Sequence, residues 1–129
     1  MILVDTSIWI DHLHDSDPVL SGLLERDEAA VHDFVIEELA LGSMARRDAV
    51  LGLLGSLRRM PSLRHDEVRA LVEQHRLWGR GLSLVDVHLL GSVLVAPGAA
   101  LWSRDRRLVV AARDVGAALF DERVDPAVG

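Results

Sequence analysis

Ile2-Leu3-Val4-Asp5-Thr6-Ser7 is the stretch that decides the fold. Three consecutive apolar residues predict a short buried strand, and the Asp-Thr-Ser that follows is typical of the start of a helix. A second apolar run, at residues 99–102, is likewise followed by a hydroxyl residue and an acid, Ser103 and Asp105. Strands that alternate with helices indicate a parallel sheet covered on both faces, so the predicted fold class is α/β.

The remaining elements extend this pattern along the chain. Further strands are expected at residues 29–31 and 117–120, with a short extended piece at 60–63. Helices are expected over residues 8–13, 18–24, 34–44, 46–57, 66–75, 84–95 and 104–113, with Asp17, Asp33 and Ser83 among their caps. No repeat or long linker divides the chain. We therefore expect a single domain over residues 1–122 and a frayed tail over 123–129.

Composition excludes several functions. The 129 residues are 50% hydrophobic and 26% charged, which is typical of a globular domain, and they include no cysteine. All 14 basic residues are arginine, which excludes chemistry that needs a lysine, and the net charge of −6 argues against a general coating of nucleic acid. The start lacks the basic region of a signal peptide, and no apolar run would span a membrane, so we expect a cytoplasmic protein.

Carboxylates stand at positions where solvation is expected to be poor. Asp5 and Asp105 each follow an apolar strand and should lie at the same edge of the sheet. Asp86 belongs to a strongly apolar helix, and Glu37 and Glu38 belong to another. Burying a lone carboxylate is costly unless it is paired or binds a metal. At least three of these acids are therefore expected where solvation is poor, and their separation along the chain fits a site assembled by the fold.

Two interpretations of these acids remain open from the residues alone. A carboxylate cluster suits a hard divalent ion such as Mg²⁺ or Mn²⁺, and sites of this kind hydrolyse phosphodiesters. The alternative is a set of helix caps, because Ser83 and Asp86 have nearly the spacing of a capping box and Asp5 and Asp105 stand where N-caps do. Helical spacing does not decide which of Glu37 and Glu38 points inward.

Four segments, at residues 2–10, 35–42, 75–86 and 101–105, together resemble the motifs of PIN-domain proteins, especially the toxin ribonucleases of VapBC toxin–antitoxin pairs. They occur in the family's order and extend over nearly the whole chain. The second motif has a glutamate followed by Leu and, four residues on, by Gly, which selects Glu38 over Glu37. The resemblance implies an α/β/α sandwich built on a short central parallel sheet.

The same resemblance implies an activity, a metal site and partners. The activity would be Mg²⁺- or Mn²⁺-dependent hydrolysis of RNA by a metal-activated water, and the partners would be a cognate antitoxin and a second copy of the chain. The metal-binding and catalytic residues would be Asp5, Glu38, Asp86 and Asp105. Thr6 and Ser103 would orient these carboxylates or a water. Ser103 stands where many family members have Thr, a change that keeps the hydroxyl.

Basic and aromatic residues near the motifs are less specific. Arg76, Arg80, Arg104, Arg106 and Arg107 are candidates for contacts to RNA phosphates, although solvated surface arginines are an equal alternative. The three tryptophans are expected in the core or a dimer interface. The apolar helix at 46–57 exceeds one face, so we expect part of it to pack on a second subunit or on the antitoxin.

Two other functions compete with the nuclease. A phospho-acceptor receiver domain also has this size and an Asp at a strand end, but such domains resemble one another in using a lysine, which this chain lacks. A PIN-fold module that binds RNA or protein without catalysis is the closer alternative. The presence of all four acids disfavours it.

Overall fold

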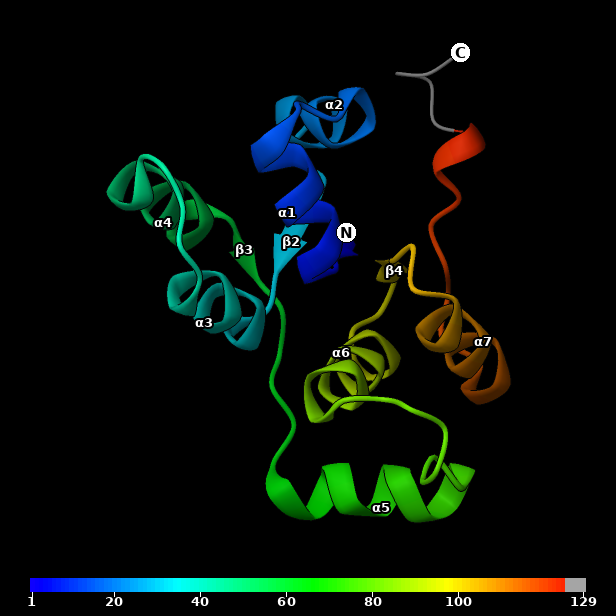
Figure 1. Ribbon diagram of the computed structural model, residues 1–129. Helices are drawn as coiled ribbons and strands as arrows, with labels where there is room; N and C mark the ends of the chain where they lie inside the picture. Colours follow the sequence, from blue (N-terminus) through cyan, green and yellow to red (C-terminus); the bar gives the residue numbers. More distant parts are fainter. Residues whose placement is uncertain (125–129) are drawn as a thin grey trace.

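A four-stranded parallel sheet forms the centre of the molecule (Figure 1). In the computed structural model, which describes residues 1–124, the strands are β1 (Ile2–Val4), β2 (Ala29–Val31), β3 (Arg58–Arg59) and β4 (Ala100–Trp102). Their order is β3-β2-β1-β4, and every neighbouring pair is parallel. The chain moves outward from β1 to β2 and β3 and then returns to the other side of β1. The switch point of the sheet therefore lies between β1 and β4, where α/β folds place their ligands.

The described residues form seven α-helices around this sheet. They are α1 (Thr6–His14), α2 (Pro18–Glu25), α3 (Asp33–Leu41), α4 (Arg47–Ser56), α5 (His65–His75), α6 (Leu84–Val95) and α7 (Arg106–Val115). In Figure 1, α3 and α4 lie on the β3 side of the sheet, α7 lies on the β4 side, and α6 lies between β4 and α5. The predicted α/β/α sandwich on a short parallel sheet is confirmed. None of these helices is long and apolar enough to cross a membrane.

Short polar residues begin most helices as predicted. Asp17 accepts hydrogen bonds from the backbone N–H groups of Val19 and Leu20 and precedes Pro18, the first residue of α2. Ser83 caps α6 through the Asp86 N–H group. The cap of α3 differs from the prediction, because the Nδ1 atom of His32 accepts from the Phe34 N–H group and Asp33 is already helical. An imidazole nitrogen here replaces the carboxylate expected from sequence.

Two predicted strands differ from the structure. The piece expected at 60–63 pairs two residues earlier, as β3, which consists of exposed arginines and so has no apolar strand pattern. The last predicted strand, 117–120, is reduced to a single parallel bridge between Leu101 and Leu119. Residues Glu122–Val124 form a 3₁₀ turn, and the rest of the expected tail, 125–129, lies outside the described residues.

The core lies on both faces of the sheet. Leu3, Val4 and Leu101 are fully buried, and so is most of α6, as its apolar sequence predicts. Trp9 and Trp102 belong to this core, each 1% exposed. Trp78 does not, because it lies in the α5–α6 loop and is 58% exposed.

The outer edge of the sheet is charged. Arg58 and Arg59 form β3, and both side chains are exposed. Arg58 pairs with Asp27 at 3.5 Å, and Arg59 pairs with Asp33. The arginines thus point their charges outward while their backbone groups pair with β2.

Candidate metal and active site

The predicted site lies at the carboxyl ends of β1 and β4, the two strands at the switch point. The backbone N–H group of Asp5, the residue after β1, donates to the carbonyl of Trp102, the last residue of β4, at 3.0 Å. Asp5 and Asp105 lie at the same sheet edge, as the strand positions predict. Parallel pairing of two strands far apart in sequence therefore creates the site.

Asp5 is the buried member of the acidic set. Its carboxylate is 7% exposed and accepts hydrogen bonds from the Thr6 N–H group at 2.8 Å and from the hydroxyls of Ser103 and Ser7 at 2.7 and 3.3 Å. Burial raises the pKa of Asp5 above its ordinary value, although these three hydrogen bonds oppose the rise. The negative charge of Asp86 raises the same pKa further. A cation at this place would relieve both effects.

Thr6 connects Asp5 to Glu38. Its backbone N–H group donates to Asp5, and its hydroxyl donates to Oε1 of Glu38 at 2.6 Å. Glu38 comes from α3, so this contact joins α1 and α3 at the sheet edge. In the described residues Glu37 has no such contact, which agrees with the choice of Glu38 over its neighbour.

Ser103 connects Asp5 to Asp105 in the same manner. Its hydroxyl donates to Asp5 and accepts from the Asp105 N–H group at 3.0 Å. Asp105 in turn caps α7, with Oδ1 accepting from the N–H groups of Arg107 and Leu108. Glu38, Thr6, Asp5, Ser103 and Asp105 therefore form one hydrogen-bonded series, which we call the hydroxyl-linked series.

Asp86 is held separately, by a capping box at the start of α6. Its Oδ2 accepts from the Ser83 N–H group at 2.9 Å, while Ser83 Oγ accepts from the Asp86 N–H group at 3.1 Å. Asp86, Asp5 and Asp105 therefore all take part in helix capping, as one of the two interpretations of the sequence predicts. Capping does not exclude a metal role. Within residues 1–124, Oδ1 of Asp86, Oδ2 of Asp105 and Oε2 of Glu38 accept no hydrogen bond from the protein.

The expectation that most of these acids are poorly solvated is wrong. Only Asp5 is buried; Asp86 is half-buried, and Glu38 and Asp105 are exposed. The apolar residues around Asp86 and Glu38 cover other sides of α6 and α3, and these two acids lie at the solvent side. The spacing of residues along a helix does not show how deeply the end of that helix is buried.

The set of candidate ligands fits a hard divalent cation, but these ligands do not converge on one point. Its members are carboxylates supported by hydroxyls, which is the chemistry that Mg²⁺ and Mn²⁺ prefer. Across residues 1–124, no three acidic or histidine side chains are already drawn together as a complete metal cluster. His12 does not contribute either, because its Nδ1 accepts from the Asp17 N–H group.

The candidate RNA-binding arginines divide into two kinds. Arg104 is committed to other partners: its guanidinium contacts Asp11 at 3.2 Å, Asp17 at 2.5 Å and Glu122 at 2.9 Å, and lies over the ring of Trp102. The carboxylates of Glu122 and Asp17 raise the pKa of Arg104. The remaining candidates lie elsewhere: Arg80 pairs with Asp114 at 2.6 Å, and Arg76 and Arg106 are exposed.

Sequence reasoning missed one polar contributor to the site. Ser7 supplies the third hydrogen bond to Asp5, and a hydroxyl two residues after an N-cap acid was the available signal. In the core, His32 and His88 are both buried, with rings 6.1 Å apart. Nothing in the spacing of residues 32 and 88 indicated this contact.

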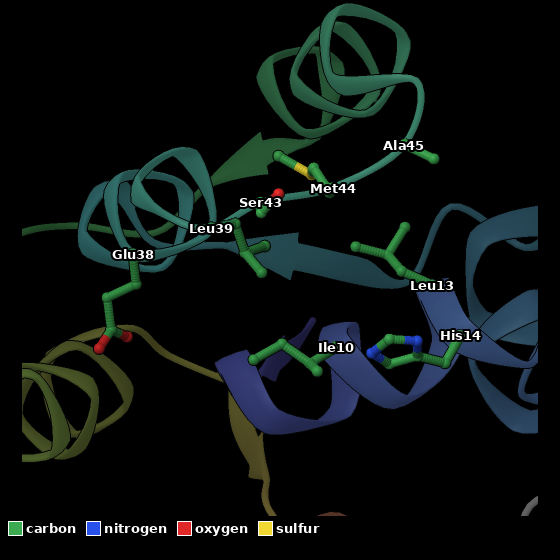
Figure 2. A pocket seen from close by; sticks show the side chains of 9 residues that line it. Ile10, Leu13, His14, Glu38, Leu39, Ser43, Met44 and Ala45 are labelled. Atoms are coloured by element: carbon green, nitrogen blue, oxygen red, sulfur yellow. The ribbon is translucent and has the colours of Figure 1, made fainter.

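An apolar pocket of about 360 Å³ opens beside Glu38 (Figure 2). Ile10 and Leu13 of α1 face Leu39 of α3 and Met44 of the α3–α4 loop across it. Glu38 lies at one end of this pocket in Figure 2. A ligand or partner that fills the pocket would therefore reach one of the candidate metal ligands.

This fold is that of PIN domains. The PIN domain family model matches residues 2–114, and the chain belongs to this family. Within the family it is similar to Ribonuclease VapC32 of Mycobacterium tuberculosis, with 57% identity over 122 residues that cover 95% of this chain and 98% of that protein. The same figures hold for strains CDC 1551 / Oshkosh and ATCC 25618 / H37Rv.

A solved structure agrees with the fold. The crystal structure of PAE2754 from Pyrobaculum aerophilum superposes with a TM-score of 0.61 and covers 92% of this chain and 87% of that one. Sequence identity in this pair is 22%, so the likeness concerns architecture alone.

Proposed function

We propose that this protein is a metal-dependent endoribonuclease, the toxin of a toxin–antitoxin pair, which hydrolyses phosphodiester bonds of cytoplasmic RNA. The observation that carries this proposal is the hydroxyl-linked series at the switch point of the sheet, with Asp86 close enough to raise the pKa of Asp5. The family relationship along nearly the full chain to a protein named Ribonuclease VapC32 supports the same activity.

Asp5, Glu38, Asp86 and Asp105 would hold Mg²⁺ or Mn²⁺. Such an ion, when bound, activates water and offsets the negative charge that grows on the phosphate and on the leaving oxygen. Oδ1 of Asp86, Oδ2 of Asp105 and Oε2 of Glu38 would be available to it, and Oδ1 of Asp5, which accepts one hydrogen bond, keeps a second lone pair for it. Burial of Asp5 supports this assignment, because a carboxylate with a raised pKa gains more from a cation than an exposed one.

Two hydroxyl groups would set the orientation of the ligands. Ser103 fixes Oδ2 of Asp5, and Thr6 fixes Oε1 of Glu38. Residues that hold a metal ligand in one orientation often matter nearly as much as the ligand itself. We therefore assign Thr6 and Ser103 as positioning residues.

Cleavage of structured RNA by the purified protein tests the nuclease. Parallel reactions contain EDTA, Mg²⁺ or Mn²⁺, and the key variant is Glu38→Gln. Its matched control is Glu37→Gln, which makes the same change one position away on an exposed residue. We expect metal-dependent fragments, a loss of about 10- to 100-fold for Glu38→Gln, and near wild-type cleavage for Glu37→Gln.

Two outcomes would contradict the nuclease assignment. Cleavage that persists in EDTA, or in both Glu38→Gln and Asp86→Asn, would mean that these acids do not perform the reaction. Absence of cleavage together with full RNA binding and full biological effect in Asp86→Asn would favour a binding module instead.

The proposed protein partners are an antitoxin and a second copy of the chain. The apolar pocket beside Glu38 supports the first, because an amphipathic segment seated there would cover a metal ligand. Exposed apolar residues on α4 and α6, among them Leu53 and Val95, support the second. Light scattering at micromolar concentration tests the homodimer, and a monomer at that concentration would contradict it.

A further inference from the structure

A second depression, of about 480 Å³, lies between the α5–α6 loop and α7. Its lining consists of Arg80, Arg106, Arg107 and Val110. All of its charged groups are guanidinium ions, in a chain whose net charge is −6. The negative net charge of the protein does not account for a basic hollow, so the arginines must be gathered here by the fold.

Among the residues that the structure describes, two of these arginines have no counter-charge. Within residues 1–124, neither Arg106 nor Arg107 has a carboxylate within ion-pair distance, and Arg80 alone of the three is paired, with Asp114. Arg104, two residues before Arg106, shows the contrast, because it contacts three carboxylates. Neighbouring cations without partners repel each other, so an anion placed between them would be favourable.

The loop is shaped to admit the Arg107 side chain. Gly81 has φ +74°, a left-handed conformation that L side chains rarely adopt. A Cβ atom at this glycine would lie 2.7 Å from Nη1 of Arg107 and 3.1 Å from its Cδ and Cζ. The Arg107 side chain therefore crosses the bare backbone of the loop. This contact fixes it toward the same hollow that Arg80 lines.

The hollow, which we call the arginine pocket, adjoins the carboxylates. Arg106 and Arg107 directly follow Asp105 on the first turn of α7. Val110 lies one turn further along the same face, since residues four apart share a helix face. On the other side, Gly81 precedes Ser83 and the capping box that holds Asp86. The pocket thus extends away from the site between two elements that each carry a candidate ligand.

We propose that Arg80, Arg106 and Arg107 form a phosphate-binding subsite, which holds an RNA backbone phosphate next to the one that is hydrolysed. Guanidinium groups suit this ligand because their paired N–H donors match the oxygens of a phosphate. Arg80, Arg106 and Arg107 are among the arginines that the sequence offers as phosphate contacts, and the carboxylates around Arg104 exclude it from this set. The inference rests on the proposed function, since it assigns a place to the RNA of that reaction.

Binding of a fluorescent single-stranded RNA by Asp86→Asn protein in EDTA tests the subsite without turnover. The variant Arg107→Gln is added to this background, with Arg69→Gln on the exposed face of α5 as the control of equal charge. We expect roughly tenfold weaker binding for Arg107→Gln. The slope of log K against log salt should fall by about 0.7, the value for one lost single-strand phosphate contact. Arg69→Gln should change neither the affinity for RNA nor the salt slope.

A pair of glycine variants tests the geometry with every arginine kept. Gly81→Ala places a Cβ against Arg107, whereas Gly79→Ala adds the same methyl at φ +72° with no atom within 4 Å. Both carry the same backbone strain, so strain alone would affect them equally. We expect weaker RNA binding in Gly81→Ala than in Gly79→Ala.

The outcomes separate this inference from the proposed nuclease. If the wild type cleaves RNA and Arg107→Gln raises KM while kcat stays within about twofold, the subsite is supported. If the wild type cleaves and Arg107→Gln matches Arg69→Gln in KM and salt slope, the subsite is wrong and the nuclease stands. If nothing cleaves, the nuclease fails, and the binding arms still decide whether the pocket holds RNA.

Discussion

Ser103 donates a 2.7 Å hydrogen bond to Asp5 across 98 positions of sequence. The same hydroxyl accepts from the backbone of Asp105 at 3.0 Å. One small side chain thus joins the ends of the two strands that flank the switch point and orders two of the candidate metal ligands. The parallel register of β1 and β4 makes this contact available.

We expect Ser103→Ala to lower the kcat/KM for RNA cleavage by about 10-fold or more, because Asp5 loses its shortest hydrogen bond. Ser103→Thr keeps the hydroxyl and should retain most activity. Ser7→Ala removes the longer bond, at 3.3 Å, and serves as the matched control with a smaller effect. Equal rates for Ser103→Ala and the wild type would show that this hydroxyl does not position Asp5.

Divalent cations should stabilise the folded protein through Asp5. Burial raises the pKa of Asp5 in the folded protein. Without a cation, the free energy of unfolding of the protein therefore falls as pH rises from about 3.9, the ordinary pKa of Asp, through the raised pKa. At neutral pH the whole penalty is present, and a bound cation offsets it. Mg²⁺ at a hundredfold excess over Kd should add about 2.7 kcal/mol to the free energy of unfolding.

Urea denaturation at pH 7, with EDTA or with Mg²⁺, measures this increment. Asp5→Asn should lose most of the increment because the buried charge is gone. Asp33→Asn, which changes a half-buried carboxylate that pairs with Arg59 away from the site, should keep it. A wild-type protein whose stability is insensitive to Mg²⁺ and Mn²⁺ would contradict the assignment of Asp5 as a ligand.

Arg104 should matter for stability more than for RNA binding. Its guanidinium contacts Asp11 of α1, Asp17 at the cap of α2 and Glu122 near the end of the described chain. Replacing it leaves three carboxylates near one another without a cation. We expect Arg104→Gln to lower the free energy of unfolding by about 1–3 kcal/mol. The salt slope of RNA binding should stay at the wild-type value, and a reduced slope would restore Arg104 as a phosphate contact.

Two helical glycines should respond to the same change with opposite sign. A Cβ on Gly91 of α6 would lie 2.0 Å from Cδ1 of Leu63, whereas a Cβ on Gly52 of α4 meets no atom within 4 Å. We expect Gly91→Ala to destabilise by about 1–3 kcal/mol through overpacking. Gly52→Ala should stabilise by about 0.5–1 kcal/mol through helix propensity. Thermal unfolding measures both, and a stable Gly91→Ala would mean that α6 and Leu63 separate easily.

Buried His32 should make the protein less stable in mild acid. Burial lowers its pKa below the ordinary 6.5, and the nearby His88 lowers it further. The unfolded chain therefore binds protons more readily, and stability is lost as pH falls below about 6.5 toward the folded-state value. The free energy of unfolding at pH 7.5 and 5.5 measures the loss.

His32→Asn should reduce that loss while keeping α3 capped, because Asn also supplies an N-cap acceptor. His14→Asn, on an exposed residue of α1, should leave the wild-type dependence unchanged. If both variants keep the full loss of stability between pH 7.5 and 5.5, His32 is not its source.

The strands at the switch point and the caps were the predictable part of this molecule. An apolar triplet before Asp5, and another before Ser103, specify two parallel strand ends, and parallel strand ends must share an edge. Exposure was not predictable in this way. Whether Asp86 or Glu38 is covered depends on neighbours from distant segments, and a count of apolar residues along one helix does not include them.

Ion pairs between residues far apart in the sequence were likewise not predictable. Arg104 and Arg107 look equivalent in the sequence, yet one meets three carboxylates and the other meets the bare backbone of Gly81. The difference arises because their side chains extend toward different neighbours: Arg104 meets Asp11, Asp17 and Glu122, and Arg107 meets the α5–α6 loop. β3 was misplaced for a similar reason, since its residues are arginines held in the sheet by β2.

The two-arginine strand at the sheet edge also bears on how copies of this protein can meet. An open strand edge is a template for pairing with another chain, and charge along that edge opposes such pairing. Here the exposed edge is only two residues long, and each carries an outward cation balanced by an aspartate. At the opposite edge, the bridge from Leu119 occupies Leu101. Both edges of the described sheet are therefore poor templates for a strand of another molecule, which favours self-association through the helices.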